Sequence, residues 1–210
     1  MAEPTTALTD WALSALAVVL GLRLLRMTAP GALAPLSRRL WGWSFLTLAV
    51  GALLGGMSHA LPPDGYAAVR ATLWLVTYAA VGLASLFLLA GAAAAVLPPG
   101  ARRPAFVLLG LRFVAFATLV LPSRQLRLVV ADAALSLLLL LLLALELIRR
   151  GDGAGRPLLG GILVAIAGGL AQSQRLAPHP LFNHNDLFHV FQMAGLLFFY
   201  RAGRALRDPP

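Results

Sequence analysis

The feature that most constrains this chain is a series of seven apolar runs, each about as long as a helix that crosses a bilayer. They cover residues 8–26, 40–61, 68–96, 104–122, 127–148, 157–174 and 184–203, separated by short segments rich in Gly, Pro and Arg. A spanning helix needs about 20 mostly apolar residues, so these runs fill the 210-residue chain and leave no room for a soluble domain. The sequence therefore predicts an all-α polytopic membrane protein, with residues 1–210 forming one domain of seven transmembrane helices.

The distribution of arginine predicts how these helices are oriented. Cytoplasmic loops of membrane proteins carry an excess of basic residues. Eleven arginines lie in the first, third and fifth loops and the C-terminal tail: Arg26, Arg38, Arg39, Arg102, Arg103, Arg149, Arg150, Arg156, Arg201, Arg204 and Arg207. Four lie in the opposite loops: Arg70, Arg124, Arg127 and Arg175. We therefore expect the N-terminus outside and the C-terminus in the cytoplasm.

Composition excludes several classes of function. The net charge of +9 comes from arginines in short loops. The sequence lacks the basic stripe with interleaved aromatic residues that would indicate a nucleic-acid partner. The chain has no Lys, so it cannot bind retinal as a Schiff base. It has no Cys, which excludes thiolate ligands and disulfides.

Composition also suggests a localisation. Abundant Ala, Leu, Gly and Arg are typical of a GC-rich bacterial genome, so we expect the bacterial inner (plasma) membrane.

Polar residues of the predicted helices gather at the predicted outer side. Ionisable groups inside a bilayer cost a few kcal/mol each and usually face the bundle interior. The outer set is Asp10, His59, Asp132, Gln172, His184, Asp186 and His189. In the last helix, Asn185, His189 and Gln192 follow helical spacing and form one polar stripe. Polar groups from several helices are therefore expected to line one outer cavity.

This set contains the donors of a possible zinc site. Catalytic zinc usually has three protein ligands and a bound water. His59, His189 and either His184 or Asp186 could supply the ligands, and Asp10 or Asp132 could orient an imidazole or accept a proton from the water. For Asp10 and Asp132 the alternative is a structural hydrogen bond between helices.

Other polar residues have simpler structural interpretations. Asn183 with Asp186 three residues later is typical of a cap at a helix start. Arg112, in the middle of the fourth run, is expected to pair with a carboxylate such as Asp132. Glu146 is expected to pair with Arg149 or Arg150 at the cytoplasmic rim.

Seven helices, the segment GGMSHAL with Ser58 and His59, and a His-rich start to the last helix resemble the superfamily of alkaline ceramidases and progestin/adiponectin-type receptors. The resemblance implies zinc-dependent hydrolysis of a lipid amide, with His59 and His189 as ligands and Ser58 in the active site. Three features depart from the pattern: Asn185 replaces a histidine ligand, Ser58 and His59 are adjacent, and only Asp64, in a loop, matches the family's aspartate. The string FNHNDLFHV is also similar to an uncharacterised bacterial membrane family, which implies no activity.

The resulting prediction is a zinc-dependent membrane hydrolase that acts on a lipid-like amide or ester at the outer face, with membrane lipids as its surroundings. The alternative is a transporter or binding protein without chemistry, in which Arg112 and Asp132 act at a polar outer cavity. Haem ligation by His59 and His189 and a structural role in a larger complex remain open, and the sequence predicts no oligomeric state.

Overall fold

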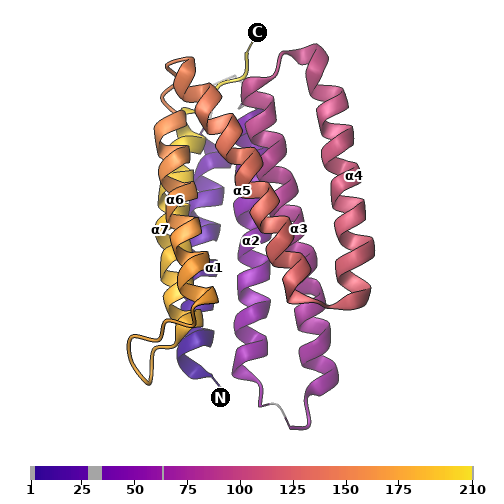
Figure 1. Ribbon diagram of the computed structural model, residues 1–210, viewed down its shortest axis with the longest axis vertical. Coiled ribbons are helices and arrows are strands. Elements are labelled where there is room, and N and C mark those ends of the chain that lie inside the picture. Colours follow the sequence, from indigo (N-terminus) through magenta and orange to yellow (C-terminus); the bar gives the residue numbers. More distant parts are fainter. Residues whose placement is uncertain (1–2, 28–34, 63, 210) are drawn as a thin grey trace.

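The computed structural model describes residues 3–27, 35–62 and 64–209, and these residues form seven α-helices (Figure 1). The helices are α1 (Pro4–Arg26), α2 (Leu36–Ala60), α3 (Ala67–Val96), α4 (Pro99–Ser123), α5 (Leu126–Arg149), α6 (Gly155–Ser173) and α7 (His184–Ala205). Each predicted run corresponds to one helix. Several helices begin a few residues before the apolar run, because a first turn accepts proline, as at Pro4 and Pro99.

Six of these helices, α1 to α6, are long and apolar enough to cross a membrane, which indicates an integral membrane protein. The remaining helix, α7, has 22 residues but does not belong to this apolar set. Its sequence explains the difference, because polar residues fill its first turns and Arg201 and Arg204 lie near its end.

Six helices form a closed ring, and α4 lies outside it. The ring runs α1, α2, α3, α5, α6, α7 and back to α1, with a smaller direct contact between α2 and α7. Helix α4 contacts α3 and α5, and α5 crosses the bundle diagonally (Figure 1). The two termini lie at opposite ends of the bundle (Figure 1). We call these the N-terminal end and the C-terminal end.

The apolar core fills the half of the ring toward the C-terminal end. Trp41 is fully buried there, and its indole nitrogen donates a hydrogen bond of 2.9 Å to the carbonyl of Phe199. Glycines allow this large ring to fit: a Cβ at Gly203 would lie 2.6 Å from the Trp41 side chain. Close packing through small residues is the usual solution in lipid, where the hydrophobic effect does not drive helices together.

The C-terminal tail closes this end of the bundle. Asp208 accepts hydrogen bonds from the backbone N–H groups of Leu36 (2.7 Å) and Ser37 (3.1 Å), so it caps the start of α2. The Arg102 guanidinium donates to the carbonyl of Pro209 at 2.9 Å. The tail therefore fixes α2 and α4 from a distant part of the sequence.

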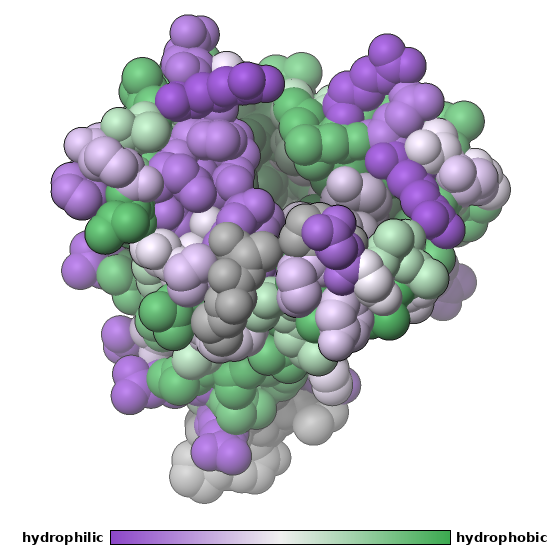
Figure 2. All heavy atoms as spheres, turned by 90° about the horizontal axis from the view of Figure 1, so that it is seen from below, coloured by the Kyte–Doolittle hydropathy of each residue, from purple (hydrophilic) through white to green (hydrophobic). Residues whose placement is uncertain are grey.

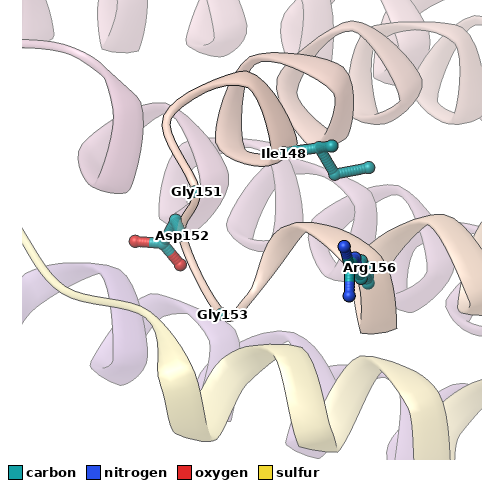
Figure 3. Close-up of a pocket in the computed structure, with 5 residues that line it drawn as sticks. All are labelled: Ile148, Gly151, Asp152, Gly153 and Arg156. Carbon is teal, nitrogen blue, oxygen red and sulfur yellow. The ribbon is translucent and has the colours of Figure 1, made fainter.

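The α5–α6 loop borders a cavity of about 260 Å³ (Figure 3). Gly151 adopts φ 69°, a left-handed conformation that glycine accepts without cost. The Asp152 carboxylate accepts a 2.7 Å hydrogen bond from the Ala154 N–H. The loop thus supplies a hydrogen-bond acceptor for a backbone N–H just before α6, and we assign this loop a structural role.

Candidate functional site

The start of α7 is fixed by a reciprocal cap. The Asn183 side chain accepts hydrogen bonds from the backbone N–H groups of Asn185 (2.7 Å) and Asp186 (3.3 Å), and Asp186 accepts one from the Asn183 N–H (2.7 Å). The predicted capping arrangement is confirmed. Asp186 is completely buried, and His189 follows one turn later on the same helix face.

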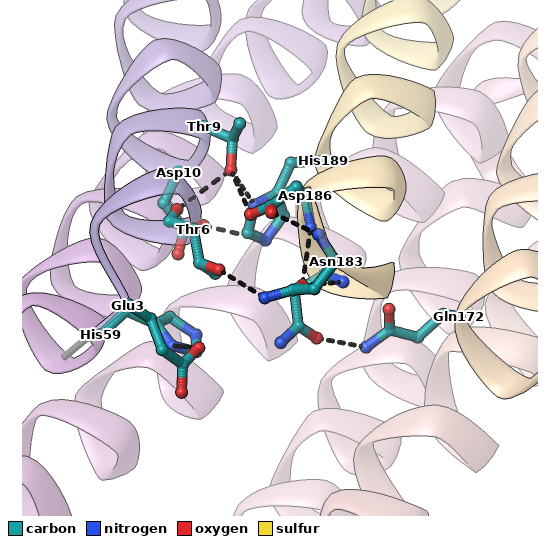
Figure 4. Close-up of polar contacts among 10 residues, drawn as sticks. Glu3, Thr6, Thr9, Asp10, His59, Gln172, Asn183, Asp186 and His189 are labelled. Atoms are coloured by element: carbon teal, nitrogen blue, oxygen red, sulfur yellow. Dashed lines mark hydrogen bonds and ion pairs between the residues drawn. The ribbon is translucent and has the colours of Figure 1, made fainter. Parts of the chain in front are cut away.

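The His189 imidazole lies between two consecutive residues of α1 (Figure 4). Its Nε2 is 3.2 Å from Asp10 Oδ1, and its Nδ1 is 2.9 Å from the Thr9 hydroxyl. Asp10 is 5% exposed and His189 is 8% exposed. Asp10 thus contacts an imidazole, the type of contact that the sequence suggested for it.

Further hydrogen bonds connect this contact to the helix start. The Thr9 hydroxyl lies 3.0 Å from the Thr6 carbonyl and 3.5 Å from Asp186 Oδ1. The Asn183 side-chain amide donates to the Thr6 hydroxyl at 3.2 Å. We call the set formed by Thr6, Thr9, Asp10, Asn183, Asp186 and His189 the α1–α7 cluster.

Glycines of α2 allow α1 to approach closely behind this cluster. A Cβ at Gly55 would lie 3.3 Å from Asp10 Oδ2. A Cβ at Gly56 would lie 2.6 Å from the Trp11 ring. Gly55 of α2 thus borders the Asp10 carboxylate.

His59 belongs to a neighbouring contact. Its Nδ1 is 2.9 Å from Glu3 Oε2, close enough for an ion pair when the imidazole is protonated, but without hydrogen-bond geometry. The Glu3 N–H donates to the His59 carbonyl at 3.1 Å. The ring also meets Trp74 edge-on, with centroids 5.4 Å apart. His59 therefore connects the start of α1 to the end of α2.

The other predicted site residues at this end make fewer contacts. Gln172 of α6 donates a 2.7 Å hydrogen bond to the Asn185 side chain. Ser58 is fully buried, and its hydroxyl has no hydrogen-bond partner among the described residues. Within that same part of the chain, the side chains of His184 and Gln192 form no hydrogen bond or ion pair with another residue.

The predicted zinc ligands do not converge on one point. Among residues 3–27, 35–62 and 64–209, no group of three His, Asp or Glu side chains is arranged to bind one metal ion. His59 contacts Glu3, whereas both ring nitrogens of His189 face residues of α1. The zinc site stays a prediction from the sequence.

Asp132 forms a second polar cluster with residues of α3 and α4. Its carboxylate lies 2.5 Å from the Arg112 guanidinium, which also contacts the hydroxyls of Ser136 (2.5 Å) and Ser85 (3.3 Å). The predicted Arg112–Asp132 pair is confirmed, and so is the pairing of Glu146 with Arg149 and Arg150, each at 2.6 Å. Among the described residues, no hydrogen bond or ion pair connects Asp132 with the α1–α7 cluster.

Sequence reasoning missed Thr6, Thr9 and Glu3. Thr6 and Asp10 have i, i+4 spacing, which places them on one helix face. However, a threonine in a helix commonly bonds its own backbone carbonyls, so nothing in the sequence distinguishes Thr9 from an ordinary helical threonine.

The fold and site define an all-helical, membrane-type bundle with a buried carboxylate–imidazole–hydroxyl cluster at one end. The chain belongs to a family of unknown function (DUF6962), whose model matches residues 5–208. No curated protein and no solved structure matches it. Nothing in these comparisons links the chain to the ceramidase and progestin/adiponectin receptor superfamily, so that resemblance stays a prediction.

Proposed function

We propose that the chain is a membrane-embedded hydrolase of a lipid-like ester or amide, with His189 as general base and Asp10 as the residue that orients it. One observation carries the proposal: the two ring nitrogens of His189 face a carboxylate at 3.2 Å and a hydroxyl at 2.9 Å. A base within hydrogen-bond reach of a nucleophile, and oriented by a third group, is the arrangement that activates weak nucleophiles.

The chemistry requires one tautomer of the imidazole. With its proton on Nε2, facing Asp10, the ring leaves Nδ1 free to accept a proton from an attacking hydroxyl or water. The imidazolium formed in this step is stabilised by the adjacent Asp10 carboxylate. Residues of the cluster thus supply both the general base and the group that stabilises its charge.

The proposal includes a membrane topology. We place the N-terminal end outside, as the arginine distribution predicts, and we take α7 as the seventh span. Two features of α7 support a seventh span. The helix is roughly 33 Å long at 1.5 Å per residue and lies against both α1 and α6. Its polar residues His189 and Asn185 form hydrogen bonds within the bundle.

The depth of the cluster suits a lipid-like substrate. Thr9 lies five residues after Pro4, which is roughly 8 Å along a helix of roughly 34 Å. If α1 crosses a hydrocarbon layer of about 30 Å, the cluster lies near the boundary where polar headgroups meet acyl chains. Figure 2 shows a hollow with an apolar lining on this end, beside the hydrophilic surface over α6 and α7.

The test is hydrolysis by purified protein in detergent micelles. Short- and long-chain p-nitrophenyl esters and the matching anilides are the probes, and wild type is compared with His189→Gln, Asp10→Asn and His179→Gln. His179 is an exposed loop histidine outside the cluster, so its variant is the matched control. We expect kcat/KM to fall about a thousandfold in both cluster variants and to stay unchanged in the control.

Two results would contradict this reading. If wild type hydrolyses no ester or anilide faster than buffer alone, the hydrolase proposal is wrong. Activity abolished by a chelator and restored by zinc would replace the metal-independent mechanism with the zinc mechanism that the sequence suggested.

A second candidate is a transporter, favoured by the separate, largely buried Arg112–Asp132 pair between α4 and α5. Buried ionisable pairs often mark ion or proton pathways in membranes. Proton-coupled uptake in proteoliposomes that is lost in Asp132→Asn, without hydrolysis by wild type, would support this candidate instead.

A further inference from the structure

We propose that Thr9 is the catalytic nucleophile and carries the acyl group as a covalent intermediate; this inference rests on the hydrolase function proposed above. The Thr9 hydroxyl is the one side-chain oxygen besides Asp10 that contacts the His189 ring in the described part of the chain. Thr9 is half-buried, so it is less enclosed than the base that it faces.

The three side chains have the roles of a hydroxyl–imidazole–carboxylate triad. Thr9 and Asp10 are consecutive on α1 and approach the two different nitrogens of His189. Such triads recur on unrelated folds, so geometry rather than sequence order identifies them. Asp186 Oδ1, 3.5 Å from the same hydroxyl, is placed to orient it.

The other hydroxyls near this end are less suited to attack. Ser58 is fully buried and has no hydrogen-bond partner among the described residues. Thr6 is also fully buried, and its hydroxyl accepts a hydrogen bond from Asn183 instead of contacting an imidazole. Among the hydroxyl groups that the structure describes at this end, only that of Thr9 combines partial exposure with a base at hydrogen-bond distance.

The reaction proceeds in two balanced steps. Thr9 Oγ1 forms a bond to the substrate's carbonyl carbon while His189 Nδ1 takes the hydroxyl proton. The bond to the alcohol or amine then breaks, and that leaving group receives the proton from His189. In the second step water attacks the threonyl ester, His189 again takes and returns a proton, and the carboxylic acid leaves with Thr9 regenerated.

A fluorophosphonate with a long alkyl chain and a biotin tag tests the nucleophile directly. Thr9 Oγ1 forms a bond to phosphorus, the phosphorus–fluorine bond breaks, fluoride leaves, and His189 takes the hydroxyl proton. We expect mass spectrometry of labelled wild type to find the adduct on the peptide that contains Thr9. The labelling rate should fall at least about 100-fold in Thr9→Val and His189→Gln and persist in Thr9→Ser, which keeps a hydroxyl.

Thr118→Val is the matched control, because Thr118 is an exposed helical threonine that bonds only backbone carbonyls of α4. If folded Thr9→Val is labelled and hydrolyses esters like wild type, Thr9 is not the nucleophile. The hydrolase proposal survives that result when His189→Gln still loses turnover, because water then attacks directly. If wild type is neither labelled nor active, both proposals fail.

Discussion

At the residue scale, the α1–α7 cluster places the carboxyl groups of Asp10 and Asp186 beside one imidazole and one hydroxyl. The negative charge of Asp186 lies at the start of α7, where a backbone N–H donates to it and the helix dipole favours an anion. The Asp10 carboxyl group faces Nε2 of His189, which shares the positive charge that the ring acquires when Nδ1 takes a proton. In the proposed mechanism, proton transfer from Thr9 to His189 creates a cation beside the Asp10 carboxyl group, and a negative charge on that group lowers the cost of the transfer in a poorly hydrated site.

The Arg112–Asp132 pair has a different character, because the surrounding groups satisfy it. The guanidinium reaches the carboxylate, the Asp132 carbonyl and two serine hydroxyls. Each side chain of the pair is 15% exposed, so removal of one partner leaves the other charge largely buried. This pattern indicates an attachment of α4 to the ring.

Arg112→Met is accordingly expected to destabilise the protein by about 3 kcal/mol, because Asp132 loses its counter-charge in a buried position. The double variant Arg112→Met with Asp132→Leu should recover most of that loss, since neither charge remains. Thermal unfolding in detergent, followed by circular dichroism, measures both. An Arg112→Met variant as stable as wild type would show that the pair does not anchor α4.

At the scale of helices, contact between α1 and α2 positions Asp10. Ser14 of α1 donates a 2.8 Å hydrogen bond to the Ala49 carbonyl, and Gly55 and Gly56 leave room for Asp10 and Trp11. The site thus depends on a helix that contributes no side chain to the α1–α7 cluster. Changes in that helix should affect stability and the geometry around Asp10 together.

Gly56→Ala tests this dependence. The added Cβ would lie 2.6 Å from the Trp11 ring and 3.0 Å from the Asp10 Cβ, and overpacking of this kind costs about 1–3 kcal/mol. We expect the midpoint of thermal unfolding to fall by about 2–4 °C per kcal/mol. Gly169→Ala is the control, because a Cβ there meets nothing within 4 Å; equal melting points for the two variants would contradict the argument.

At the scale of the molecule, the sequence predicts what depends on local spacing or on the thickness of a membrane. Apolar length located the helices, and pairs at helical spacing, such as Asn183 with Asp186, were predicted correctly. Apolar length does not reveal the order of the helices around the ring. Asp132 was grouped with the outer polar residues, but α5 brings it to Arg112 of α4 instead of to the α1–α7 cluster. Thr9 becomes notable only because packing brings α7 to α1.

The proposed topology rests on the arginine distribution alone, and the absence of cysteine makes it directly testable. Single cysteines at Asp64, in the α2–α3 connection, and at Arg103, near the start of α4, are both at exposed positions on opposite ends of the bundle. In intact cells a membrane-impermeant maleimide should label Asp64→Cys, whereas Arg103→Cys should react only after the membrane is opened. This result follows if basic loops stay in the cytoplasm. The reverse pattern would move the α1–α7 cluster to the cytoplasmic face, and labelling of both from outside would show that α3, the helix between the two positions, does not cross the membrane.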